Sequence, residues 1–363
     1  MAGEIWRVPL GGGPPIRSID EGAPVFSHSP VYTADGRGIV HSSNRGGATN
    51  IWFLPLNGRR PIRLTNGPGP DVSPTIAADG AIAFANSRWR STLEAHDLSG
   101  RPVRTLVTHT PFVWGPSISP GGREVAFSRS EVDGTWHIWT VPFGGGVARP
   151  LASTEAGEVY PRWAPDGSYA LFNTWSAPHR IGRLPAHGGA PTMLKFTGEG
   201  PVSFADISPD GRRIAFSRAE PQGERIYIAS ASGGDARLLT SSAGATPRWS
   251  PDGSLVAFST ERGYNGGILV IHADGTGERR LTTEGGWPVW WPDGQQIGYL
   301  AVGANGNQEI RVTGLDGSGS RTLSAVKLVG TNHPFDLTRD ARTIVVSNGV
   351  HVSDEIWLLE PRR

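Results

Sequence analysis

The sequence contains no cysteine and only two lysines among its 363 residues. Without cysteine the protein has no disulfide bond, no thiolate metal site and no thiol nucleophile, and both the cytoplasm and a periplasm suit such a chain. The sequence has 34 basic and 33 acidic side chains, so the formal net charge is +1. A nearly neutral chain has no overall attraction for nucleic acid or an anionic membrane, and we expect neither as a partner.

The sequence also lacks any apolar run approaching the eighteen residues of a membrane-spanning helix, and no segment keeps a helical period. Its first residues, MAGEIWRVPLGGG, lack the basic and apolar regions of a signal peptide. We therefore expect a soluble protein, periplasmic or cytoplasmic, while a chain that opens in a strand-like run also suits a fragment of a longer protein. The GxSxG, GxxxxGK[ST] and HExxH motifs and the spaced carboxylates of a calcium loop are absent.

What the sequence does have is 50 glycines and 30 prolines, placed at regular intervals between short apolar runs. A turn tetrapeptide recurs every 41 to 47 residues. Its copies are TADG (33–36), AADG (77–80), SPGG (119–122), APDG (164–167), SPDG (208–211), SPDG (250–253), WPDG (291–294) and a degenerate TRDA (338–341). Pro presets the first corner of such a turn, Asp accepts backbone hydrogen bonds, and Gly takes the left-handed φ of the next corner. This period, with several short strands per repeat, is typical of a β-propeller blade.

Each repeat predicts four antiparallel strands, A to D. TPRW (246–249) is typical of A, LVAFST (255–260) of B, RIYIAS (225–230) of C and ARLLT (236–240) of D. We predict an all-β chain, one domain over residues 1–363, folded as an eight-bladed propeller of four-stranded antiparallel blades. The blades would start near residues 29, 73, 115, 160, 204, 246, 287 and 334.

The two chain ends are predicted to close the ring in one blade. That blade would take A, B and C from residues 334–360 and D from PIRSI (15–19), within an N-terminal segment 4–19. Both EIWRVPL (4–10) and DEIWLLE (354–360) resemble strand C, so either can fill that place. Most of the 13 tryptophans repeat in register, among them Trp52, Trp139, Trp163 and Trp249, and packing between blades accounts for them.

Three copies of the repeat, SPGGREVAFSR (119–129), SPDGRRIAFSR (208–218) and SPDGSLVAFST (250–260), resemble the TolB-like, WD-repeat-related propeller family. The resemblance covers nearly the whole chain, and it implies a propeller that holds a protein or peptide over the mouth of its channel. TolB itself has six such blades, against the eight predicted here. Similar propellers are fused to winged-helix regulators, kinases and serine peptidases and occur in oligogalacturonate lyases, so fold alone leaves the function open.

The binding face is predicted to be the one where the D-to-A and B-to-C loops, the longer and more varied loops, surround the channel. The predicted ligand-binding residues are Phe26, His28, Trp114, Tyr160, Phe204, Trp287, His333 and His351. Aromatic rings there would stack on a sugar or anchor an apolar side chain of a peptide. Arg88, Arg90 and Arg180 are candidates for pairing a carboxylate, or are solvated loop charges.

His28, Trp114 and His333 share one register, five positions before their turn tetrapeptides. In the predicted ring the first and last blades are neighbours, so His28 and His333 would approach each other, with His41 and His351 on the same two blades. Such imidazoles suit a divalent metal or a general base. The alternative is that each histidine hydrogen-bonds a loop backbone.

Two functions follow from these patterns. The favoured one is a monomeric scaffold that binds a protein, a peptide or a small polar ligand at the channel mouth, with no cofactor and no chemistry of its own. The alternative is a carbohydrate-active lyase or hydrolase whose catalytic residues are His28 and His333, with or without a divalent metal. A third hypothesis is that the chain is an architectural domain of a larger regulator or kinase.

Overall fold

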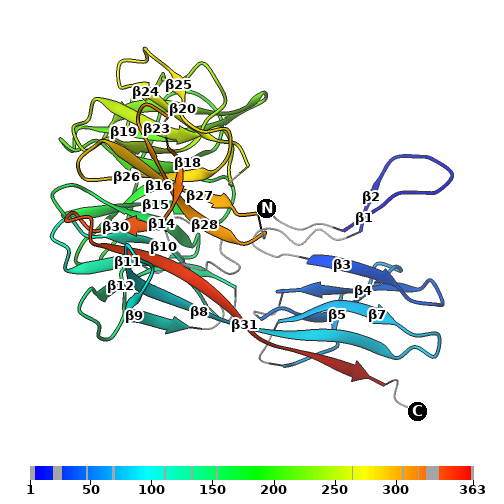
Figure 1. Ribbon diagram of the computed structural model, residues 1–363. Helices are drawn as coiled ribbons and strands as arrows, with labels where there is room; N and C mark the ends of the chain where they lie inside the picture. The colour runs from blue at the N-terminus through cyan, green and yellow to red at the C-terminus, as the bar shows by residue number, and fades with distance from the viewer. Residues whose placement is uncertain are drawn as a thin grey trace. The chain divides into compact units, whose positions relative to one another are not determined.

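The computed structural model describes residues 5–18, 27–45, 48–67, 70–109, 112–131, 134–152, 154–263, 265–304, 306–317, 319–323 and 335–360. Within these ranges the chain is all β, with 31 strands and no helix (Figure 1). The described residues therefore form no helix that is long and apolar enough to span a membrane. The chain divides into two compact units: a small unit of residues 1–90, 130–135 and 351–363, and a large unit of residues 91–129 and 136–350.

The large unit contains five sheets, each built from four strands consecutive in sequence. The first sheet contains β10 (Val113–Ile118), β11 (Glu124–Ser130), β12 (Trp136–Pro142) and β13 (Arg149–Pro150), and the second contains β14 (Glu158–Trp163), β15 (Tyr169–Thr174), β16 (Ile181–Pro185) and β17 (Thr192–Met193). The third contains β18 (Val202–Ile207), β19 (Arg213–Glu220), β20 (Gly223–Ser230) and β21 (Arg237–Leu238), and the fourth contains β22 (Ala245–Trp249), β23 (Leu255–Ser259), β24 (Ile268–His272) and β25 (Arg279–Arg280). The fifth contains β26 (Gly286–Trp290), β27 (Gln296–Val302), β28 (Gln308–Gly314) and β29 (Arg321–Thr322). Their antiparallel pairing matches the predicted A-to-D order.

The turn tetrapeptide forms the hairpin between the first two strands of a sheet, as predicted. In the turn between β22 and β23, the N–H of Gly253 donates to the carbonyl of Ser250 at 2.9 Å, and Gly253 has φ +73°. Asp252 accepts from the Ser250 hydroxyl at 2.6 Å and from the Ser254 N–H at 3.0 Å. These hydrogen bonds, that of Ser250 foremost, lower the pKa of Asp252 and keep it ionised as the acceptor in the turn.

A sixth sheet joins parts of the chain that are far apart in sequence. It contains β30 (Asp336–Leu337), β31 (Thr343–Leu359), β8 (Ile82–Asp97), β9 (Pro102–His109) and β7 (Asp71–Ile76). Residues 343–350 of β31 and 91–97 of β8 belong to the large unit, whereas the remainder of each strand belongs to the small unit. The large unit therefore takes two strands of this sheet from residues 91–109 and two from residues 336–350.

Each sheet of the large unit shares a hydrophobic core with the next one. The sixth sheet shares one core with the fifth sheet and another with the first, so the shared cores connect six sheets in a cycle. Representative buried pairs, in order around the cycle, are Ile138 with Leu184, Ile181 with Phe216, Ile228 with Phe258, Val270 with Ile297, Leu300 with Ile344, and Leu93 with Phe127. Trp139, Trp163 and Trp249 pack against these cores, as their register predicted.

The structure does not confirm the expected ring of eight sheets or its expected closure. The predicted closing strand, Ile16–Arg17 (β2), pairs instead with Trp6–Arg7 (β1) in a two-stranded sheet. This pairing is local, and closing the short loop around Gly12 and Gly13, both at positive φ, costs less chain entropy than a pairing across the whole sequence. The last predicted blade also lacks a break between its B and C strands, because β31 runs without interruption from Thr343 to Leu359.

The small unit contains one further four-stranded sheet of consecutive strands: β3 (Ser27–Tyr32), β4 (Gly38–Ser43), β5 (Asn50–Pro55) and β6 (Ile62–Arg63). It also contains β1, β2, β7 and the first part of β8, which pairs with β7 from Asp71 opposite Asn86 to Ile76 opposite Ile82. Buried Val40, Ile51 and Phe84 form a core between these strands. The first predicted repeat thus folds as a four-stranded sheet of this unit, whereas the second is divided, with residues 73–90 in this unit and residues 91–109 in the large unit.

Candidate functional site

A β-bulge near the start of the first strand shapes one position in each of the five consecutive sheets of the large unit. The register shifts there in β10, β14, β18, β22 and β26. The bulged residues have φ between 53° and 61° and are Gly115, Tyr160, Phe204, Thr246 and Trp287. In the small unit Ser29 and Ser73 have the same φ, so the bulge belongs to the repeat itself. What differs between sheets is the side chain that the bulge directs.

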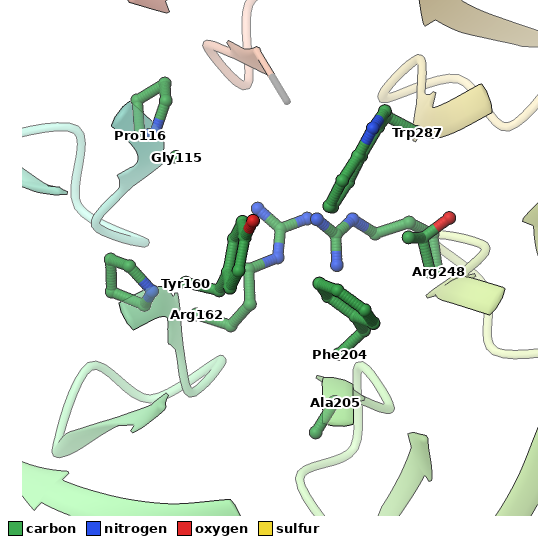
Figure 2. Close-up of a pocket in the computed structure, with 10 residues that line it drawn as sticks. Gly115, Pro116, Tyr160, Arg162, Phe204, Ala205, Arg248 and Trp287 are labelled. Atoms are coloured by element: carbon green, nitrogen blue, oxygen red, sulfur yellow. The ribbon is translucent and has the colours of Figure 1, made fainter. Parts of the chain in front are cut away.

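At three of these positions the bulge carries an aromatic side chain, and the three rings meet. The ring centroids of Tyr160 and Phe204 are 5.0 Å apart, those of Tyr160 and Trp287 5.6 Å, and those of Phe204 and Trp287 5.2 Å. Figure 2 shows the three rings around a common centre. A left-handed φ costs a bulky residue about 1–3 kcal/mol, so three aromatic residues in this conformation mark a place where the surrounding structure holds them.

Trp114, next to the bulge of β10, extends this group of rings. It lies parallel to Tyr160 at 6.2 Å between centroids and stacks on Trp136 at 3.7 Å. Trp175 contacts both tryptophans, at 5.9 and 5.5 Å. We call Trp114, Tyr160, Phe204 and Trp287 the aromatic mouth. All four were predicted as site residues, and the structure brings them together from four different sheets.

Trp136 and Trp175 were missed by the sequence reasoning. They lie at the start of the third strand and after the end of the second strand of adjacent sheets, at β12 and β15. The B-to-C loops were predicted to share a face with the D-to-A loops, so tryptophans at the ends of those loops were the signal that would have found them.

Charged side chains follow the bulges. Arg162, Asp206 and Arg248 each lie two residues after a bulged residue, and Asp336 opens β30 of the sixth sheet. Arg162 bridges two acids: its Nε is 3.4 Å from Asp206 Oδ1 and its Nη1 is 3.7 Å from Asp336 Oδ2. The same carboxylates accept backbone N–H groups, Asp206 from Trp249 at 2.8 Å and Asp336 from Ile118 at 2.7 Å. These interactions join five of the six sheets.

Arg248 differs from Arg162 in having no such partner. It is 7% exposed, and the only hydrogen bond of its side chain among the described residues runs from Nη1 to the carbonyl of Pro247 at 3.4 Å. Burial and the charge of Arg162 lower the pKa of Arg248 to about 9, although Asp206 and Asp336 oppose this shift. The guanidinium groups of Arg162 and Arg248 are drawn between the aromatic rings in Figure 2.

Two cavities meet Arg162. The cavity beside the aromatic mouth, lined by Tyr160, Phe204, Trp287 and both arginines, has a volume of about 10 Å³, which is room for about one water molecule. The other cavity, about 830 Å³, is lined by Arg162, by Asp206 and Asp336, by Trp163, Trp249 and Trp290, and by the turns between first and second strands. Sequence reasoning did not find this second cavity, because it placed binding only at the longer loops.

Of the predicted group of four histidines, the structure describes the side chains of His28 and His41 alone. His28 lies on β3 of the small unit, where its Nδ1 is 3.0 Å from the hydroxyl of Ser29 and partial desolvation of the imidazole lowers its pKa. Phe26 and His333 lie outside the described residues, and of His351 only the backbone, within β31, is described. Over the described ranges no group of three or more histidine and carboxylate side chains is arranged to hold a metal ion.

The other predicted arginines do not contribute to the aromatic mouth. Arg90 is exposed on β8, the side chain of Arg88 is outside the described residues, and Arg180 is exposed just before β16. The Arg180 N–H donates to the hydroxyl of Thr174 at 2.9 Å, which shapes the local loop. Pairing of a ligand carboxylate by these three residues stays a prediction.

Comparison with known proteins identifies the class of protein. The model of the family described as the TolB beta propeller domain matches residues 82–286 and 198–348, which together cover more than half of the chain. The chain belongs to this family, and the resemblance seen in the sequence is confirmed.

Individual relatives agree with this assignment. The Tol-Pal system protein TolB of Anaeromyxobacter dehalogenans (strain 2CP-1) is 36% identical over 121 residues, 32% of this chain and 27% of the relative. The uncharacterized protein Atu1656 of Agrobacterium fabrum is 32% identical over 232 residues, 60% of this chain and 78% of the relative. The chain thus matches only about a quarter of the curated TolB from Anaeromyxobacter.

Two solved structures share the fold. A putative TolB from Agrobacterium tumefaciens has a TM-score of 0.63 at 20% identity, covering 73% of this chain and 99% of that one. TolB from Acinetobacter baumannii has a TM-score of 0.55 at 16% identity, covering 84% and 80%. At these identities the likeness concerns the fold alone.

Proposed function

We propose that this chain is a scaffold that binds a protein or peptide partner through the aromatic mouth of the large unit. The observation that carries the proposal is the meeting of rings from four sheets: Tyr160, Phe204 and Trp287 at the bulge position of the repeat, and Trp114 next to that position. We further propose that the large unit is the propeller, with six blades whose ring is closed by the sheet of β8, β9, β30 and β31, and that the chain acts as a monomer.

Rigid aromatic rings suit protein recognition. Tyrosine and tryptophan offer a large contact area with few rotatable bonds and are enriched among the residues that dominate interface affinity. Burial raises the pKa of Tyr160 to about 12, so its hydroxyl stays protonated and can donate a hydrogen bond at neutral pH. The mouth therefore combines apolar faces with at least one polar group that fixes orientation.

The size of the cavity beside the rings favours a surface-bound segment over an enclosed small molecule. Pockets that enclose a drug-sized ligand measure roughly 300–1,000 Å³, whereas the cavity among Tyr160, Phe204 and Trp287 measures about 10 Å³. A peptide or a protein loop that contacts the half-buried Trp114 and Tyr160 needs no such volume, while Phe204 and Trp287, 8% and 5% exposed, belong to the core shared with the sixth sheet. The name of the Anaeromyxobacter relative assigns that protein to a Tol-Pal system, and we propose for this chain only the general property of holding a protein partner.

The carbohydrate-active alternative has less support. It depended on His28 and His333, of which His28 belongs to the small unit while the aromatic mouth belongs to the large unit. No feature of the described residues favours catalysis over binding. The compartment, periplasmic or cytoplasmic, stays a prediction.

The proposal is tested by the affinity of a captured and then purified partner for matched variants. Trp114→Ala and Tyr160→Ala should each weaken binding by about tenfold or more, as loss of a central aromatic contact does. Trp357→Ala is the control, because Trp357 is 51% exposed on β31 of the small unit. Equal affinity of all three variants and the unchanged protein would contradict the proposal.

A further inference from the structure

The buried side chain of Arg248 is the group that the proposed function leaves unexplained. A guanidinium has five N–H donors, and the described residues supply Arg248 with one acceptor, the Pro247 carbonyl at 3.4 Å. Its Nε is buried and has no partner. A buried charge normally keeps close partners, because desolvation without them is costly. Arg248 therefore sits in a place that suits an added acceptor.

The nearby carboxylates do not fill that place. Asp206 and Asp336 both pair with Arg162, at 3.4 and 3.7 Å, and each also accepts a backbone N–H. Over the part of the chain that the structure describes, Arg248 forms no ion pair within 4 Å. Two arginines and two aspartates are formally neutral together, but the geometry gives both acids to Arg162 and leaves one positive charge without a direct counterpart.

The surroundings limit what such a counterpart can be. Thr246, Phe204 and Trp287 line the same cavity of about 10 Å³ as the two arginines. This space has room for about one water-sized group, such as a halide ion or one oxygen of a carboxylate. A doubly charged anion such as phosphate is disfavoured, since Asp206 and Asp336 act on Arg248 from nearby and would repel it.

We propose that Arg248, together with Arg162, forms an anion site that takes a single carboxylate group. A guanidinium forms strong charge-assisted N–H···O bonds with a carboxylate, and Arg248 has donors left for a carboxylate oxygen placed in this space. The carboxylate comes either from a small free acid or from an acidic group of a peptide. The site exists whether or not the aromatic mouth binds a partner, so this proposal and the proposed function fail on different measurements.

Calorimetric titration of sodium acetate into the full chain, in a zwitterionic buffer without other small anions, tests the site. We expect acetate to bind at one site and acetamide, its neutral counterpart of similar shape, not to bind. Arg248→Gln should weaken acetate binding about tenfold or more, the effect of losing a charged hydrogen-bond partner. Arg237→Gln is the matched control, because Arg237 is an exposed arginine on β21 of the same unit.

A second readout separates an anion site from a structural role. Without acetate, Arg248→Gln and Arg248→Met should unfold at the same temperature as the unchanged protein or higher, because each removes a buried charge that lacks a partner. A structural role predicts a lower unfolding temperature for both variants. In crystals of the unchanged protein soaked in bromide, an anomalous peak should lie against the Arg248 guanidinium.

N-acetylglycine identifies the source of the carboxylate. Tighter binding of N-acetylglycine than of acetate assigns the site to a peptide-borne carboxylate, and the reverse order assigns it to a small free acid. Acetate affinity unchanged by Arg248→Gln, equal binding of acetamide, or bromide crystals with only water at Arg248 would each overturn the proposal.

Discussion

Replacing Asp336 tests how the sheets of the large unit are held together. Its carboxylate accepts the Ile118 N–H of the first sheet at 2.7 Å and lies 3.7 Å from Arg162 of the second. The side chains of Arg162 and Asp336 are 14% and 15% exposed, so water screens this pair only partly. One side chain of the sixth sheet therefore binds the two sheets that follow it around the cycle.

The expected losses follow from these contacts. Asp336→Asn keeps an acceptor for the Ile118 N–H but removes the charge, which lowers that hydrogen bond from about 1.5–3 to about 1 kcal/mol. Loss of the ion pair adds about 1 kcal/mol, so the free energy of unfolding should fall by about 2 kcal/mol. Asp336→Ala also leaves the N–H and Arg162 without this partner and should cost about 3–5 kcal/mol.

Urea unfolding at neutral pH measures these differences, with Asp293 as the control. Asp293 is an exposed aspartate of a turn tetrapeptide that accepts the Gln295 N–H at 2.9 Å, and its replacement by Ala should cost less than about 1 kcal/mol. A double-mutant cycle of Asp336→Asn with Arg162→Met should show a coupling energy of about 1 kcal/mol. Equal losses for Asp336→Ala and Asp293→Ala, or no coupling, would refute the account of how these sheets are joined.

Three further predictions concern the folded chain. His41 is fully buried, and burial lowers its pKa to about 4. The stability that comes from its neutral form is complete above pH about 6.5 and falls as the pH drops from there to about 4. His41→Leu should flatten this part of a pH-dependent unfolding curve, and an unchanged curve would count against this account. Gly285→Ala should lower the unfolding temperature several times more than Gly211→Ala does. Both glycines have positive φ, but an added Cβ at Gly285 would lie 2.3 Å from the Tyr299 ring, whereas Gly211 has open space. Equal shifts of the unfolding temperature would show that the contact with Tyr299 is relieved. Phe216→Ala, at a fully buried site between the second and third sheets, should lower the free energy of unfolding by about 3–5 kcal/mol, and a loss below about 1 kcal/mol would mean that the core is not packed there.

The individual sheets of the large unit were predictable because their signals are local. Pro, Asp and Gly at fixed offsets define the hairpin, and apolar alternation defines the strands beside it, so LVAFST at 255–260 differs from β23 by one residue. Which sheets join into one unit depends on pairing between distant strands. No local sequence pattern distinguishes a strand that stops at an expected loop from one that continues through it. The strands β8 and β31, 16 and 17 residues long, both continue through expected loops.

The candidate site was predictable in part for the same reason. Tyr160, Phe204 and Trp287 were grouped as aromatic residues of the loops expected around the channel, and the structure shows that they also occupy one position of the repeat. Arg162 and Arg248 occupy another shared position, but the order of sheets around the cycle decides that Arg162 takes both aspartates. The histidine site depended on the first and last repeats being neighbours, which is the part of the architecture that was not confirmed.

The most direct test of the central claim, that the aromatic mouth is the partner-binding surface, is a fluorine NMR spectrum of the chain labelled with 5-fluorotryptophan. Single Trp→Phe variants assign the resonances. On adding the purified partner, the signals of Trp114 and Trp287 should shift or broaden, while those of Trp6 and Trp357, both about half exposed in the small unit, stay in place. Unchanged signals of Trp114 and Trp287 at saturation with the partner would contradict the claim.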